Sequence, residues 1–247
     1  NHAFFKALLF LSAGSVIHAM ADEQDMRKMG GLRKILPFTY AMFVIGSFAL
    51  MGLPFLTGFY SKDVILEQAF SRYTNLSHFA YWLGSMAAFF TAFYSMRLLC
   101  LVFLSKANGY RSVYASAHDS PLRMGLPLAV LAVPSLFIGF LTKDMIIGFG
   151  TNFWGSAIFT RPENQYLVDS EFIPYSFKIL PLILAITGGC LSLLLYSNYS
   201  GLLVEVKLSE VGRSLYTFLN RKWFFDKTYN YYIGMPLMRI AYTVTYK

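Results

Sequence analysis

Three basic side chains lie inside stretches that are otherwise apolar, and each of them can take up and release a proton. Lys62 lies in the run from Phe38 to Phe70, while Lys6 and His2 share the first apolar stretch, at a spacing that places them on one helical face. A lysine at the bilayer centre costs about 2.5–3.5 kcal/mol on insertion scales, so it is usually functional there. A lysine removed from water can exchange a proton near neutral pH, and an unperturbed histidine titrates at about pH 6.5. We therefore expect a proton relay made of these three residues.

Each candidate also has a structural interpretation. Lys62 could sit at a helix end and extend its ammonium group to the membrane interface, although its apolar and aromatic neighbours argue against an end. Lys6 could be an interfacial anchor, and His2 a solvated histidine. Asp63 either pairs with a cation or caps a helix that begins beside it, where the helix dipole favours a negative charge.

The element that must position Lys62 is interrupted. Residues 52–63 read GLPFLTGFYSKD, in which Pro54 removes a backbone donor and disfavours continuation of a helix. In lipid, a broken helix is tolerated only where its freed backbone groups face protein or a water-filled cavity. The sequence therefore predicts a discontinuous transmembrane helix with Lys62 at or near the break, an arrangement typical of membrane proteins that move ions or protons.

The composition places these elements in a polytopic membrane protein. Hydrophobic residues make up 56% of the chain and charged residues 14%, whereas soluble domains have roughly 45–50% and about 25%. Because a span needs roughly 20 mostly apolar residues, we predict an all-α transmembrane bundle of about six spans, one of them discontinuous. The apolar stretches are His2–Met20, Leu36–Ala69 (one span and then a second, interrupted one), Phe79–Leu104, Met124–Leu141 and Phe177–Tyr196.

The pattern changes after residue 197. Residues 198–247 mix basic residues with aromatic residues and leucines and contain no apolar run of span length. Such a helix lies in the membrane interface, so we divide the chain into a transmembrane region, 1–197, and the start of a lateral amphipathic helix, 198–247. The net charge of +8 then favours contact with anionic membrane lipids and not with nucleic acid. Cys100 and Cys190 form no metal-binding or iron–sulfur motif.

Several motifs carry a resemblance to a known family. HAFFKALLFL (2–11), GSVIH (14–18), EQDMRKMGGL (23–32) and LPFLTGFYSKD (53–63) resemble the antiporter-like subunits of NADH:ubiquinone oxidoreductase, respiratory complex I, those of the chain 5 type. KDM (143–145), GTNFW (150–154) and RKWFFD (221–226) are similar to the mitochondrial version. The same family is related to subunits of multisubunit sodium/proton antiporters.

The resemblance implies two inverted half-channel repeats and a long lateral helix. It identifies this chain with the C-terminal portion: the second repeat from its tenth helix onward, the span before the lateral helix, and the start of that helix. By their motifs, Lys6 matches the family's lysine on the central polar axis and His2 its relay histidine. Lys62 matches the lysine of the discontinuous twelfth helix, beside the proton exit.

The implied function is part of the proton-translocating membrane arm of complex I, which couples electron transfer from NADH to ubiquinone to proton pumping. The resemblance places NADH, FMN, the iron–sulfur clusters and ubiquinone on other subunits, so this chain would bind no cofactor or metal and carry no redox site. Its implied partners are the neighbouring antiporter-like subunit, the other membrane-arm subunits and the polypeptide carrying the missing N-terminal half. Its implied location is the mitochondrial inner membrane. Two alternatives stay open: a subunit of a multisubunit sodium/proton antiporter, and a structural remnant with no active channel.

Overall fold

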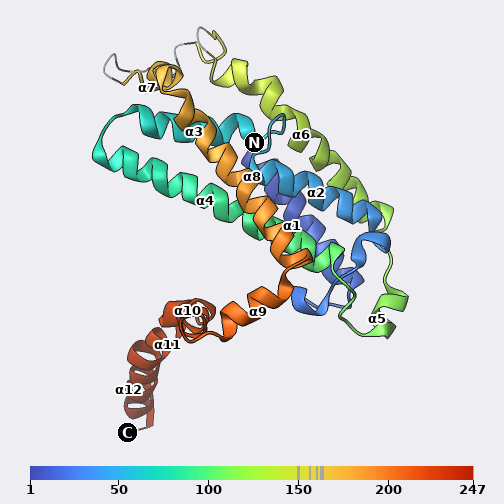
Figure 1. Ribbon diagram of the computed structural model, residues 1–247. Coiled ribbons are helices and arrows are strands. Elements are labelled where there is room, and N and C mark those ends of the chain that lie inside the picture. The colour runs from blue at the N-terminus through green and yellow to red at the C-terminus, as the bar shows by residue number, and fades with distance from the viewer. Residues whose placement is uncertain (149–150, 156, 160, 162–163, 247) are drawn as a thin grey trace. The chain divides into compact units, whose positions relative to one another are not determined.

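A computed structural model describes residues 1–148, 151–155, 157–159, 161 and 164–246 (Figure 1). Gly150 of the GTNFW motif lies outside these residues. The described residues form helices and connecting segments and contain no strand, which confirms the all-α prediction. The chain divides into two units, 1–197 and 198–247.

Among the described residues of the first unit, four helices are long and apolar enough to cross a membrane. Their near-continuous apolar sequences match four of the predicted spans, with ends that differ by a few residues. They are α1 (His2–Ala19), α4 (Asn75–Leu99, continued by a π-helical segment, Cys100–Leu104), α6 (Leu122–Ile146) and α8 (Tyr175–Ser197). The fold is therefore that of a multi-pass membrane protein.

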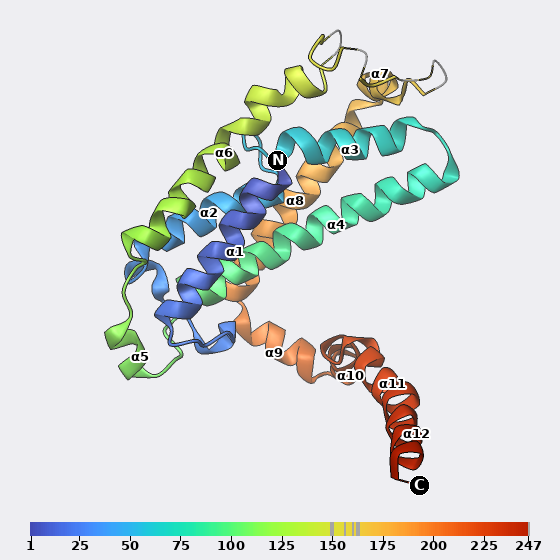
Figure 2. The same ribbon diagram turned by 180° about the vertical axis from the view of Figure 1, so that it is seen from behind.

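The region from Leu36 to Ala69 differs from the prediction of one span followed by an interrupted one. It holds two shorter helices, α2 (Pro37–Met51, 15 residues) and α3 (Phe59–Ser71, 13 residues), separated by residues 52–58. Each is shorter than the roughly 20 residues of a full span, so the two half-helices together supply the length of one discontinuous crossing. In both views α3 leads away from the end of α2 in a similar direction (Figures 1 and 2).

Local chemistry explains where α2 begins and ends. Pro37 occupies the first turn, where its missing N–H is not needed. At the other end Gly52 takes a positive φ of 74°, and the N–H groups of Gly52 and Leu53 donate to the carbonyls of Ala49 and Phe48. This is the Schellman arrangement that ends a helix at a glycine.

The N-terminus of α2 is held by a residue from a distant loop. That loop follows the short helix α5 (Arg111–Ser116). The Asp119 carboxylate accepts the backbone N–H of Phe38 at 2.7 Å and the hydroxyl of Thr39 at 2.6 Å. A carboxylate at this end satisfies free N–H groups and complements the helix dipole.

Helices α4 and α8 run in the same direction and lie side by side in both views (Figures 1 and 2). A side chain at Gly188 on α8 would overlap the backbone carbonyl of Phe89, so the glycine allows close contact. The fully buried Tyr81 donates its hydroxyl to the Phe177 carbonyl at 2.7 Å. Pro181 has no N–H for that carbonyl four residues earlier, so Tyr81 supplies the missing donor.

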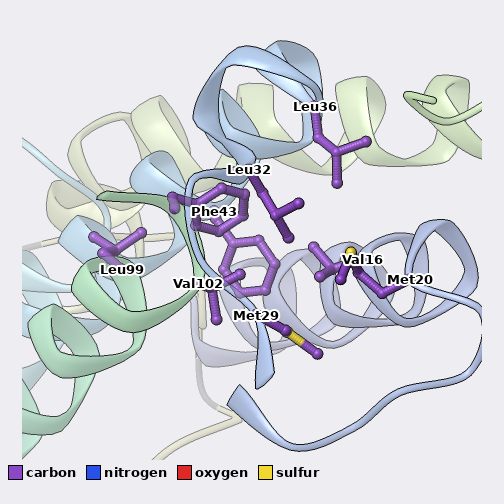
Figure 3. Packing of buried hydrophobic residues seen from close by; sticks show 9 residues of the cluster. Val16, Met20, Met29, Leu32, Leu36, Phe43, Leu99 and Val102 are labelled. Carbon is purple, nitrogen blue, oxygen red and sulfur yellow. The ribbon is translucent and has the colours of Figure 1, made fainter. Parts of the chain in front are cut away.

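A hydrophobic cluster lies where the first polar link meets the bundle (Figure 3). Its side chains come from α1, the link, α2 and the end of α4, and they are Val16, Met20, Met29, Leu32, Leu36, Phe43, Leu99, Val102 and Phe103. The link is tied to the loop after α4, where Asn108 donates to the Arg27 carbonyl, and to α5, where Tyr114 donates to the Gly30 carbonyl. Within the link, hydrogen bonds from Arg27 lower the pKa of Asp25 to about 2.

The connection between α6 and α8 packs on the end of α3. Its described part contains α7 (Tyr166–Asp169) and a 3-10 turn, Ser170–Phe172. Ser71 donates its hydroxyl to the Tyr166 carbonyl at 3.1 Å. Ile173, 4% exposed, joins a cluster with residues of α3 and α4. This connection therefore covers the outer end of the second half-helix.

The second unit consists of short helices instead of one continuous helix. They are α9 (Ser200–Leu208), α10 (Glu210–Asn220), α11 (Phe225–Tyr229) and α12 (Met235–Tyr246). Positive φ angles at Lys222, Trp223 and Phe224 separate α10 from α11. The spacing of Val211, Leu215 and Phe218 puts them on one apolar face of α10. Contact of this face with a membrane surface stays a prediction.

Candidate functional site

Lys62 lies one turn into α3, and its side chain turns back toward the end of α2. Its Nζ donates a hydrogen bond to the carbonyl oxygen of Met51, 2.7 Å away. A Cβ at Gly52 would stand 2.6 Å from that Nζ, so the glycine both ends α2 and leaves room for the ammonium group. The Lys62 side chain is 25% exposed. The structure therefore places this lysine at the break, with its ammonium group at the C-terminus of α2.

Asp63 lies beside Lys62 and carries the second charge of the site. Its Oδ1 is 3.9 Å from the Lys62 Nζ, and its side chain is 10% exposed. This oxygen has no hydrogen-bond partner among the described residues. Gly58 occupies the N-cap of α3 and no side chain caps it, so of the two interpretations of Asp63, pairing with a cation holds and capping is wrong.

The three predicted site residues line one cavity of about 700 Å³, which we call the lysine cavity. His2 and Lys6 reach it from α1 and Lys62 from α3. Helices α4 and α6 add polar groups to the same wall, namely Thr91, Tyr94, Thr142 and Lys143. A cavity of this size has room for several water molecules, and these polar groups give such waters hydrogen-bond partners.

The two residues from α1 differ from Lys62 in exposure. His2 and Lys6 are both exposed in this chain, and the His2 ring makes an edge contact with Phe5 at a centroid distance of 5.1 Å. The preceding Asn1 donates its side-chain amide to the Thr57 carbonyl at 3.4 Å. The start of α1 is thereby tied to the break between α2 and α3.

A second cavity, of about 500 Å³, lies on the acidic side of α3, and we call it the acidic cavity. Asp63 and Glu67 line it one helical turn apart. Further charged residues come from α6, the connection and α8, and they are Lys143, Asp144, Glu171 and Lys178. Glu67 was not among the predicted site residues, although its spacing from Asp63 places both carboxyl groups on one helical face.

The two cavities share part of their walls. Tyr60, Lys143 and Ile147 line both of them. The Lys143 Nζ lies 5.7 Å from the centroid of the Tyr60 ring and 5.5 Å from that of Phe140, distances at which a cation is attracted to an aromatic face. The site thus consists of two cavities with charged groups in their linings, on two faces of α3.

The chemistry available is proton exchange between side chains and water. Lys62, Lys6 and His2 can each hold or release a proton, and the Met51 carbonyl and the Asp63 carboxylate both attract the charged form of Lys62. Among the residues that the structure describes, no group of three or more His, Cys, Asp or Glu could hold a metal ion.

The chain is similar over its whole length to curated proteins with one name. NADH-ubiquinone oxidoreductase chain 5 of Phytophthora infestans is 57% identical over 247 residues, and that of Marchantia polymorpha 52% over 248, with all of this chain covered in both. The Rhizopus stolonifer protein is 53% identical over 93% of this chain. The chain spans 37%, 37% and 35% of these three relatives.

A family described as "NADH:quinone oxidoreductase/Mrp antiporter, TM" matches residues 1–91. These residues hold α1, α2, α3 and the first part of α4, and with them Lys6, Lys62 and His2. The matched region therefore includes the broken helix and much of the lysine cavity.

Proposed function

Because the chain belongs to the antiporter-like membrane family that includes NADH-ubiquinone oxidoreductase chain 5, we propose that it is part of the proton-translocating membrane arm of respiratory complex I. In that role it couples electron transfer from NADH to ubiquinone, carried out on other subunits, to proton movement. Its place would be the mitochondrial inner membrane. The neighbouring antiporter-like subunit and the other membrane-arm subunits would be its partners.

The observation that carries the proposal is the position of Lys62. Its ammonium group lies at a helix break, bonded to the Met51 carbonyl, on the wall of a cavity that also holds Lys6 and His2. A cation within a membrane is costly, and here a carbonyl and a carboxylate lower that cost. We propose that Lys62 and Lys6 change charge as protons move through water in the lysine cavity. His2 would relay protons at the end of that cavity.

A subunit of a sodium/proton antiporter is the alternative that the family description supports, since it covers both kinds of protein. The names of the relatives favour complex I. Purification of the chain from its native membrane separates the two: a complex I subunit brings flavin and iron–sulfur subunits with it, whereas an antiporter subunit does not.

The test of proton transfer is Lys62→Ala in the assembled complex. Proton pumping is measured in vesicles next to the rate of NADH oxidation, with the amount of assembled complex determined on native gels. We expect assembly to be retained and pumping to be largely lost. Normal pumping by a normally assembled Lys62→Ala complex would show that the chain is a structural component with no active channel.

A further inference from the structure

The loop between α2 and α3 contains a threonine whose hydrogen bonds reach into α6. Thr57 is fully buried. Its hydroxyl donates to the carbonyl of Pro134 at 2.8 Å and accepts the N–H of Gly139 at 3.2 Å. Its own N–H donates to the carbonyl of Ser135 at 3.4 Å. Gly139 and Ser135 are four residues apart, which is the spacing of donor and acceptor in an α-helix, so Thr57 bonds to both ends of one helical turn.

This contact is made by backbone as well as by the side chain. A Cβ at Gly139 would stand 2.6 Å from the Thr57 carbonyl oxygen and 2.7 Å from its Cα. A Cβ at Gly58 would overlap the carbonyl of Ala49 near the end of α2. The two glycines therefore let the loop lie directly against α6 on one side and α2 on the other. The free polar groups of a broken membrane helix need such partners inside the protein.

Three elements that line the lysine cavity meet at Thr57. Its hydroxyl and N–H bind α6, its carbonyl accepts the Asn1 amide at the start of α1, and the next residue, Gly58, is the N-cap of α3. The Gly58 carbonyl in turn accepts the backbone N–H of Lys62 at 3.0 Å. A shift of Thr57 relative to α6 would therefore move the first turn of α3 and the lysine that it carries.

We infer that Thr57 is a positioning residue, whose hydroxyl fixes the α2–α3 break against α6 and so holds the Lys62 ammonium group on the Met51 carbonyl. This inference rests on the proposed role of Lys62 in proton transfer. It adds that the position of this lysine depends on a hydroxyl that does not touch it. A threonine that merely satisfies its own hydroxyl in a buried place would not affect Lys62.

The experiment compares Thr57→Val with Thr57→Ser in the whole complex. Valine keeps the shape of threonine and lacks the hydroxyl, whereas serine keeps the hydroxyl. Each variant is examined by cryo-EM for the contact between Lys62 and Met51, and in vesicles for protons pumped per NADH oxidised. Loss of one net hydrogen bond changes an equilibrium constant by up to about tenfold, so we expect the occupancy of that contact and the pumping ratio to fall in Thr57→Val. Thr57→Ser should retain both the contact and the pumping ratio.

The outcomes separate this inference from the proposed function. A Thr57→Val complex that keeps the contact and the pumping ratio overturns the inference, whatever Lys62→Ala does. So does a valine variant whose only defect is a smaller amount of complex with normal pumping. If Thr57→Val displaces Lys62 while Lys62→Ala pumps normally, the positioning stands and the proposed function fails. Thr57→Ala, which removes the hydroxyl with less bulk, replaces the valine variant if that one does not assemble.

Discussion

The Lys62 ammonium group closes the C-terminal end of α2 from across the break, by donating to the Met51 carbonyl at 2.7 Å. The last carbonyls of a helix have no donor within the helix. In α2, backbone N–H groups of residues 52 and 53 serve two of them, and a lysine side chain serves a third. The two half-helices are thus joined by a group that can exchange a proton.

Substitution of Gly52 should disturb this join directly. Alanine at a positive φ costs about 1–2 kcal/mol, and its Cβ would stand 2.6 Å from the Lys62 Nζ. We expect Gly52→Ala to assemble in reduced amount and to pump fewer protons per NADH oxidised. Gly201→Ala is the matched control, because a Cβ there meets open space. Equal pumping by the two variants would show that the Lys62 ammonium group does not need the space beside Gly52.

Lys6 is the second basic group of the lysine cavity, and its loss should interrupt the proposed relay. We expect Lys6→Ala to lower proton pumping in vesicles, while the amount of assembled complex on native gels stays normal. Lys34→Ala removes an exposed lysine of the polar link that lines neither described cavity, so it should behave like the unmodified protein. A Lys6→Ala complex with full pumping would remove this residue from the relay.

Tyr81 should stabilise the packing of α4 on α8. In Tyr81→Phe the Phe177 carbonyl loses its donor, and a buried unsatisfied polar group costs about 1–3 kcal/mol. We expect a lower temperature of thermal inactivation than in Tyr110→Phe, a control at a tyrosine that is 80% exposed. In a Pro181→Ala background residue 181 gains an N–H, so the cost of Tyr81→Phe should shrink. An unchanged cost in that double-mutant cycle would argue against this account.

Asp119 should stabilise the start of α2 from outside the helix. Asp119→Ala removes the acceptor for the Phe38 N–H and the Thr39 hydroxyl, and loss of an N-terminal cap costs about 0.5–2 kcal/mol. We expect faster hydrogen exchange of the first-turn amides of α2, measured by mass spectrometry. Asp22→Ala, at an exposed acidic residue of the link, is the control. Unchanged exchange in Asp119→Ala would mean that the cap does not hold this end.

The spans and the break could be predicted because their signals are local. Long apolar runs gave α1, α4, α6 and α8, and glycine and proline at residues 52–54 marked the end of α2. The division of residues 36–69 was not predictable in the same way. Its sequence is apolar enough for a full span, and only the positions of the helix ends reveal two half-helices.

The contacts that build the site could not be predicted, because their partners are far apart in the chain. Thr57 bonds to residues of α6 about eighty positions later, and Asp119 to the start of α2 across a similar separation. Nothing in the composition around either residue indicates its partner. In the second unit, the positive φ angles fall on Lys222, Trp223 and Phe224, where no glycine or proline marks a break.

The wall shared by the lysine cavity and the acidic cavity is made of the side chains of Tyr60, Lys143 and Ile147. Side chains change rotamer within nanoseconds where they are free to move, whereas packed helices shift over microseconds to milliseconds. A rotamer change of Tyr60 or Lys143 would therefore alter the lining of both cavities at once. Such a change needs no movement of the backbone of the bundle.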